Sequence, residues 1–72
     1  MTPESLRHQA SAVRRVAVAK LDFVKNPNAI KRYAHAPQLL EGMADSANEA
    51  LEGAANLDRW AASIERERAR PA

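Results

Sequence analysis

The chain has 72 residues, a formal net charge of +2 and no cysteine. This length allows one domain at most, and the absence of cysteine excludes disulfide bonds and thiol nucleophiles. Because sixteen of the apolar residues are alanines, few large side chains are available for a core, and we expect oligomerisation or a partner protein to complete it.

The first predicted element is a helix over about residues 3–25. Thr2 can cap its N-terminus, Pro3 suits the first helical position, and Glu4 favours the positive end of the helix dipole. Asn26 and Pro27 end the helix, because the residue before a proline avoids the helical region. Its apolar residues recur at steps of three or four, as on one face of an amphipathic helix. They are Leu6, Ala10, Val13, Ala17, Leu21 and Val24, with Val16 and Phe23 widening the stripe.

The connection over residues 26–36 leaves room for one or two further helical turns, with Asn28 as the predicted cap. His35 precedes the second long helix, where we expect it to pack against Leu40 or to hydrogen-bond the free N–H groups at the helix start. Loops held by a rigid scaffold often carry contacts. This one has a basic, partly aromatic tip formed by Lys31, Arg32, Tyr33 and His35.

A second helix is predicted over about residues 37–67, followed by a frayed basic tail at 68–72. Its apolar positions follow the heptad spacing of a coiled-coil seam. They are Leu40, Met43, Ala47, Ala50, Ala54, Leu57, Ala61 and Ile64. The small alanines favour close approach of a neighbouring helix. Gly42 and Gly53 each destabilise a helix by about 1 kcal/mol relative to alanine, so a break at either one is an alternative. Gly53, on the flank of the seam, is also a candidate packing contact.

Together these elements predict an all-α fold, an antiparallel hairpin of two long helices in a single domain spanning residues 1–72. Charge supports the antiparallel direction, because residues 1–35 carry a net +5 and residues 36–58 a net −5. Folding the chain back at the connection brings Lys20 and Lys25 nearest to three acidic residues, Glu41, Asp45 and Glu49. Exposed pairs of this kind select an orientation more than they stabilise it.

The second helix is the longer of the two, so part of it is expected to overhang the first. Trp60 and Ile64 fall in that part, and an exposed Trp–Ile surface is unusual in a monomer. Two hairpins packed as a homodimeric four-helix bundle would cover it.

The sequence predicts no catalytic, cofactor-binding or metal-binding residue, and we do not expect an enzyme. Gly42 and Gly53 are isolated, so they do not form a phosphate-binding loop. Neither His8 nor His35 follows a glutamate at the spacing of a di-metal site in a helical bundle. No cofactor and no small-molecule substrate is indicated.

The resulting hypothesis is a small protein–protein interaction module, an inhibitor, adaptor or scaffold, which pairs with itself and with an unidentified larger protein. Docking by a helix face or by the tip would use Lys31, Arg32, Tyr33, His35, Leu57, Trp60 and Ile64. The alternative is a nucleic-acid-binding accessory protein that contacts phosphates through Arg14, Arg15, Lys25, Lys31 and Arg32. Charges interrupt the N-terminal segment and no apolar run is long enough for a membrane span, so we expect a cytoplasmic location.

Overall fold

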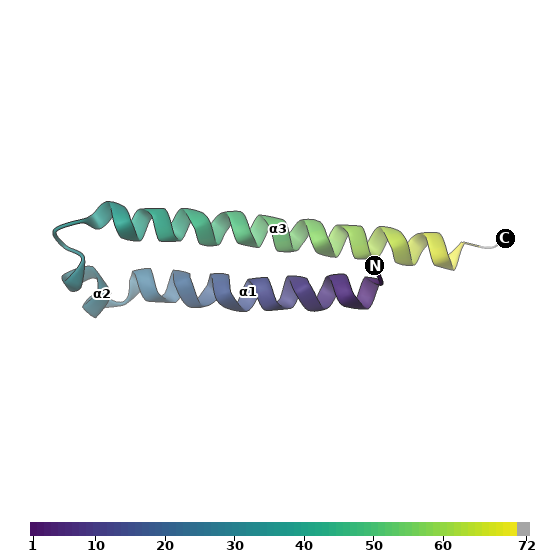
Figure 1. Cartoon of the computed structure of the whole chain (residues 1–72), viewed down its shortest axis with the longest axis horizontal. Helices are drawn as coiled ribbons and strands as arrows, with labels where there is room; N and C mark the ends of the chain where they lie inside the picture. The colour runs from purple at the N-terminus through teal and green to yellow at the C-terminus, as the bar shows by residue number, and fades with distance from the viewer. Residues whose placement is uncertain (71–72) are drawn as a thin grey trace.

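The structure of the protein is a computed structural model that describes residues 1–70. Three helices follow one another: α1 (Pro3–Lys25), α2 (Pro27–Arg32) and α3 (Pro37–Ala69). α1 and α3 lie side by side in opposite directions, and α2 sits at the turn between them (Figure 1). The molecule is a rod with principal extents of 62 × 15 × 15 Å. This arrangement confirms the prediction of an all-helical hairpin.

The ends of α1 are set by local chemistry. At its start, the backbone N–H of Ser5 donates a hydrogen bond to Thr2 Oγ1 at 3.1 Å, and Pro3 occupies the first helical position. At its end, Asn26 has φ −68° and ψ 127°. This extended conformation is the one that a following proline imposes, so the helix cannot continue past Lys25.

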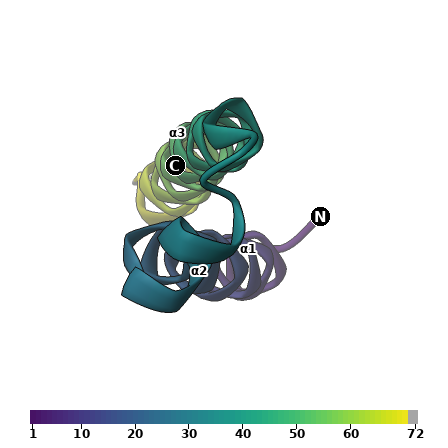
Figure 2. The ribbon, with the colours of Figure 1, turned by 90° about the vertical axis from the view of Figure 1, so that its left-hand side faces the viewer.

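The short helix α2 starts on the same residue that ends α1. The Asn26 side chain accepts a hydrogen bond from the backbone N–H of Asn28 at 2.8 Å. Asn26 is therefore the cap of α2, and the prediction that Asn28 would cap it was wrong. The extended backbone of Asn26 ends α1, and the side-chain oxygen of the same residue accepts a hydrogen bond from a free N–H group at the start of α2. Seen from the turn, α2 covers the end of α1 below the start of α3 (Figure 2).

No side chain caps the start of α3, where Ala36 is the N-cap residue. His35 is exposed, and it does not bond the free N–H groups of this helix end, which was one of its two predicted roles. Pro37 takes the first helical position, where its missing N–H removes one of the unpaired donors.

α3 is one continuous helix, so neither glycine breaks it. Neither glycine packs on another helix, because a Cβ added at Gly42 or Gly53 would meet no atom within 4 Å. The predicted packing contact of Gly53 is therefore absent within the hairpin. Helix α3 also continues through Arg68, where the sequence predicts a frayed tail; residues 71–72 of that tail lie outside the described residues.

The core between α1 and α3 is built of small side chains. Leu6 is the one large residue among the described part of the chain with an exposed fraction near zero, and Pro3 joins it at the start of α1. The other buried residues are alanines: Ala10, Ala17, Ala29, Ala47, Ala54 and Ala61. Those of α3 recur every seven residues, as along a coiled-coil seam. The predicted seam is therefore the line along which α1 approaches.

Candidate protein-interaction face

One side of the α1–α3 seam is closed by two ion pairs. Arg7 donates from Nε and Nη2 to Glu65 Oε1 at 2.9 and 2.7 Å, and Arg14 pairs with Asp58 one heptad further along. The hydrogen bond to Glu65 and the negative charge of its carboxylate raise the pKa of Arg7. We call this flank the ion-paired side.

These pairs differ from those that the charge blocks predict. Neither Lys20 nor Lys25 forms a salt bridge with any residue between 1 and 70. The antiparallel direction was predicted correctly, but the partners were not. A pair across a helix seam needs two positions that border the buried line on the same side, and Lys20 borders it on the opposite side, next to Met43.

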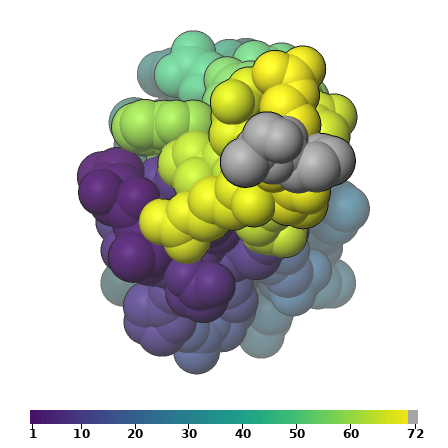
Figure 3. Space-filling view, turned by 90° about the vertical axis from the view of Figure 1, so that its right-hand side faces the viewer, coloured from purple at the N-terminus to yellow at the C-terminus, as the bar shows by residue number. Residues whose placement is uncertain are grey.

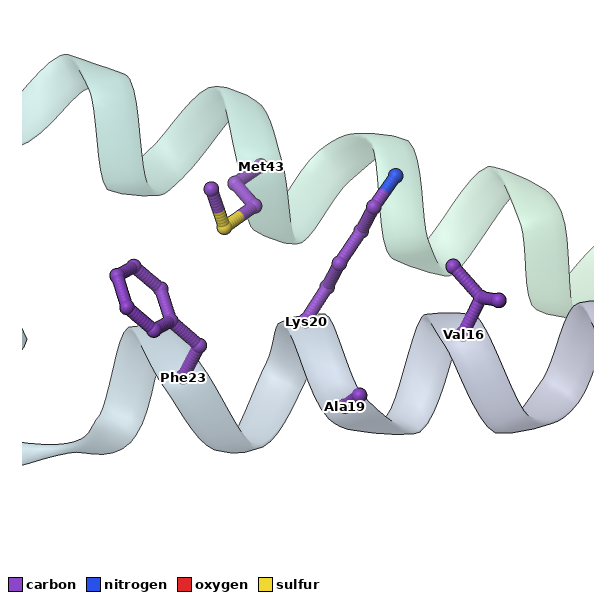
Figure 4. A pocket seen from close by; sticks show the side chains of 5 residues that line it. All are labelled: Val16, Ala19, Lys20, Phe23 and Met43. Atoms are coloured by element: carbon purple, nitrogen blue, oxygen red, sulfur yellow. The ribbon is translucent and has the colours of Figure 1, made fainter.

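This opposite side carries two open apolar recesses. The first, of about 380 Å³, is lined by Val16, Ala19, Lys20, Phe23 and Met43 (Figure 4). The second, of about 300 Å³, is lined by Ala12, Val13, Val16 and Ala50. Because Val16 lines both recesses, they form one continuous surface, which we call the open face. Lys20 is the one charged residue that lines them, and its side chain extends from α1 toward α3 (Figure 4).

Large apolar side chains on the open face remain about half exposed. The exposed fractions are 58% for Val16, 41% for Phe23, 56% for Leu39 and 50% for Trp60. Leu39 lies four residues before Met43 in α3, about one helical turn, so it is on the same side of that helix. Trp60 lies 21 residues, or three heptads, after Leu39, so it falls on the same side of α3 as Leu39. The open face thus runs along most of the hairpin.

Trp60 is exposed because of its position around α3 and not because α3 overhangs there. Its neighbour Ala61 is buried, and Glu65 still reaches Arg7 of α1, so α1 covers α3 at this level. Viewed from the end of the rod opposite the turn, the first residues of α1 lie against the C-terminal part of α3 (Figure 3). The predicted overhang of Trp60 was therefore wrong, although its side chain is 50% exposed.

Two other predicted contact residues of α3, Leu57 and Ile64, are half-buried. Val16 and Phe23 are exposed, although the sequence pattern assigned both to the buried stripe of the first helix. A signal for their exposure does exist. Gln9, Val16 and Phe23 recur every seven residues in a line of their own, next to the seam but outside it.

The tip holds three exposed side chains and one that is packed. Lys31, Arg32 and His35 are exposed. Tyr33 is half-buried, with its ring edge-on to Phe23 at a centroid distance of 6.3 Å and an interplanar angle of 70°. This geometry is typical of favourable aromatic pairs. The tip is therefore fixed to the end of the open face through Phe23.

The candidate nucleic-acid contacts are not equally available. Arg14 is engaged with Asp58 on the ion-paired side. The other four are exposed and have no salt-bridge partner in the described part of the chain: Arg15, Lys25, Lys31 and Arg32. Tyr33, the ring that would stack on an unpaired base, already packs against Phe23.

The described residues offer little for other kinds of site. Between residues 1 and 70, no group of three or more histidine, aspartate or glutamate side chains is placed to hold a metal ion. No polar or charged side chain in that range is buried. None of the three helices combines the length and apolar character that a membrane span requires. The open face is thus the main chemical feature, a surface that releases ordered water when an apolar partner covers it.

No protein-family model, curated protein or solved structure matches this chain. Its function is therefore inferred from the open face and the tip.

Proposed function

We propose that the protein is a non-enzymatic protein–protein interaction module that pairs with a second copy of itself through the open face, as a four-helix bundle. The observation that carries this proposal is the row of half-exposed large apolar side chains on one side of the hairpin, with Val16 and Trp60 at 58% and 50% exposure. Surfaces of this kind mark interaction sites, because monomers seldom leave a contiguous apolar patch in water.

Energetics support a second copy as the occupant. A fully buried large apolar side chain contributes about 1.5–3 kcal/mol, and within the hairpin Leu6 is the one such side chain that is fully buried among the described residues. A partner on the open face would complete the burial of Val16, Phe23 and Trp60. The open face has to be covered whenever the hairpin folds. A second copy of the same chain is present wherever the chain is made, so it is the simplest occupant.

The area of the open face is compatible with a stable dimer. α1 has 23 residues, and its length of about 35 Å sets the length of the face. With the 15 Å width of the rod, the projected area is about 500 Å² per copy, and the accessible area of a corrugated helix surface is larger than its projection. Standard interfaces bury about 800 Å² of accessible surface per partner.

Two valines of α1 provide a matched test. Val16 on the open face and Val18 on the other side of α1 are 58% and 49% exposed. We expect Val18→Asp to leave the mass in solution at twice 7.9 kDa, and Val16→Asp to give the monomer, because a carboxylate on the open face would have to be buried unpaired. Light scattering after size exclusion measures the mass, and far-UV circular dichroism checks that both variants remain helical.

A second measurement needs no substitution. Trp60 is the single tryptophan of the chain and lies on the open face, so its emission maximum should move to shorter wavelength as the protein concentration rises. A wild-type protein that stays monomeric and keeps the same emission at every concentration would overturn the proposal.

The tip is the second contact surface in this proposal, through which the bundle acts as an inhibitor, adaptor or scaffold on a larger protein. Lys31, Arg32 and His35 are exposed there on a short, structured connection, and such positions are free to meet an acidic partner surface.

Nucleic-acid binding remains the second candidate function. The observation that favours it is that Lys25, Lys31 and Arg32 lie close together in the chain with no acidic residue between them and without salt bridges among residues 1–70. Phosphate binding by these bases predicts an affinity for DNA or RNA that falls steeply as salt is added. The absence of any mobility shift at low salt, with the folded dimer present, would remove this candidate.

A further inference from the structure

We infer that the two copies pair about a two-fold axis perpendicular to their helices, so that the bundle carries its two tips at opposite ends. This inference rests on the proposed self-association through the open face. Three features of the open face support it: the order of side-chain sizes along α3, the position of Gly53, and a line on α1 whose midpoint lies at the same height.

The first feature is a line of four residues on α3. Leu39, Ser46, Gly53 and Trp60 recur every seven residues on the open side of this helix. The order is large, small, small, large, and it is symmetric about the point midway between Ser46 and Gly53. A two-fold axis through that point places Leu39 of one copy against Trp60 of the other, and Ser46 against Gly53. Antiparallel α3 helices would then approach closely at the small residues and make apolar contacts at both ends.

The second feature is that no contact within the hairpin requires a glycine at position 53. Glycine destabilises a helix interior relative to alanine, and a Cβ at this position would meet no atom within 4 Å. The residue therefore lies in open space on the open face of the single copy. The two-fold arrangement supplies what is missing, since the helix of the second copy would pass directly over Gly53, where a side chain would hold the two backbones apart.

The third feature is that a line of residues on α1 has its midpoint at the same height. Gln9, Val16 and Phe23 form a second line at intervals of seven residues, with Val16 in the middle. Val16 lines the same recess as Ala50, and Ala50 is adjacent to the midpoint of the α3 line. One axis therefore serves both helices, so α1 packs on α1 and α3 on α3.

The competing arrangement has its two-fold axis parallel to the rod and places α1 of one copy on α3 of the other. It would place Trp60 over the polar start of α1, near Gln9. The perpendicular axis leaves the smaller Phe23 against Gln9 but pairs Trp60, whose burial contributes more, with Leu39. It also separates the two tips by about 40 Å, from the 1.5 Å rise per residue of α3, so that the bundle presents one tip at each end.

Lys20 gives an independent check on the buried surface. It is the one charged residue lining the recesses, and in the bundle its ammonium group would be partly withdrawn from water near the axis. Replacing it with methionine, Lys20→Met, keeps an unbranched side chain that is one atom shorter and removes the charge. We expect the dimer dissociation constant to fall by about tenfold or more, measured by analytical ultracentrifugation. An unchanged or raised constant would overturn the placement of Lys20 inside the interface.

Cysteine cross-linking tests the axis itself, because the natural chain has no cysteine. Val16→Cys should form a disulfide between copies on mild oxidation, since residues on the axis of closely packed helices fall within disulfide reach. Leu39→Cys combined with Trp60→Cys should also cross-link, whereas Val18→Cys, on the other side of α1, should not. Non-reducing gels report the covalent dimer, and helicity is checked for each variant.

The outcomes separate the inference from the proposed function. Cross-linking through Val16→Cys, with none through Val18→Cys, supports the perpendicular axis. A different result would be a non-covalent dimer in which Val16→Cys alone stays unlinked but Val16→Cys combined with Gly53→Cys cross-links. This result overturns the perpendicular axis in favour of the parallel one and leaves the dimer proposal intact. A wild-type protein that is monomeric by light scattering overturns both.

Discussion

The two glycines of α3 allow a direct measurement of whether another helix lies over the open face. Inside the hairpin, Gly42 and Gly53 are equivalent, since both are in the interior of one continuous helix and neither would bring a Cβ within 4 Å of another atom. Replacing either with alanine should therefore stabilise an isolated hairpin by about 1 kcal/mol, the difference in helix propensity. For a chain of 72 residues, this corresponds to a rise in melting temperature of about 4–8 °C.

The proposed bundle removes this equivalence. Gly53 lies on the contact line between the two α3 helices, whereas Gly42 lies off that line, on its solvent side. We expect Gly42→Ala to gain the full increment at every protein concentration. Gly53→Ala should gain less than half of it when the dimer is populated, because the added methyl group separates two backbones in contact and offsets the propensity gain. On dilution to monomer, the two variants should converge.

Thermal unfolding followed by circular dichroism at low and high protein concentration measures both differences. Equal gains for Gly42→Ala and Gly53→Ala at a concentration where light scattering shows a dimer would refute the close approach at Gly53. The comparison is insensitive to errors in the propensity scale, because the same substitution is made twice in the same helix.

Two further predictions concern the seam. Ala54→Leu should destabilise the protein by about 1–3 kcal/mol, because Ala54 is fully buried between α1 and α3 and an enlarged side chain overpacks a close contact. Ala69→Leu, at an exposed position of α3 that lines neither recess, should change the denaturant midpoint little; equal midpoints would mean that the alanine seam is not closely packed. For the Arg14–Asp58 pair, whose side chains are 42% and 30% exposed, a double-mutant cycle with alanine should give a coupling free energy below about 1 kcal/mol, decreasing with added salt, and a value of several kcal/mol would contradict the half-exposed geometry.

Where the helices end could be read largely from the sequence, because the responsible interactions are local. In both Asn26-Pro27 and Ala36-Pro37, the residue before the proline is kept out of the helical region, and the heptad spacing of α3 extends over many turns. Even here, the prediction of Asn28 as the cap of α2 was wrong. The side chain that caps a helix has to belong to the residue with extended backbone, and proline gives that conformation to Asn26.

The division of the hairpin into an ion-paired side and an open face could not be predicted in the same way. Val16 directly precedes Ala17 in the sequence, and Phe23 lies one heptad after Val16. The two side chains therefore form a line beside the buried line of Ala10 and Ala17. Whether such a neighbouring line is covered depends on the angle at which α3 approaches and on the size of the side chains between the helices. Charge blocks likewise predicted the direction correctly but not the partners, since the pairing of Arg14 with Asp58 depends on the register between the two helices.

The position of Leu6, the one large side chain that is fully buried among residues 1–70, has a consequence for how the hairpin opens. Contacts near the turn, such as Phe23 with Tyr33, close a short loop, whereas Arg7 and Glu65 are separated by 58 positions along the chain. Closing the longer loop costs about 1.5 kcal/mol more in chain entropy, so the end of the rod that carries both chain termini is the part most prone to fray. Leu6 and Pro3 are buried at that end. They stabilise the packing of α1 on α3 where closure is least favoured. Loss of the first six residues would therefore let the two helices separate from this end toward the turn.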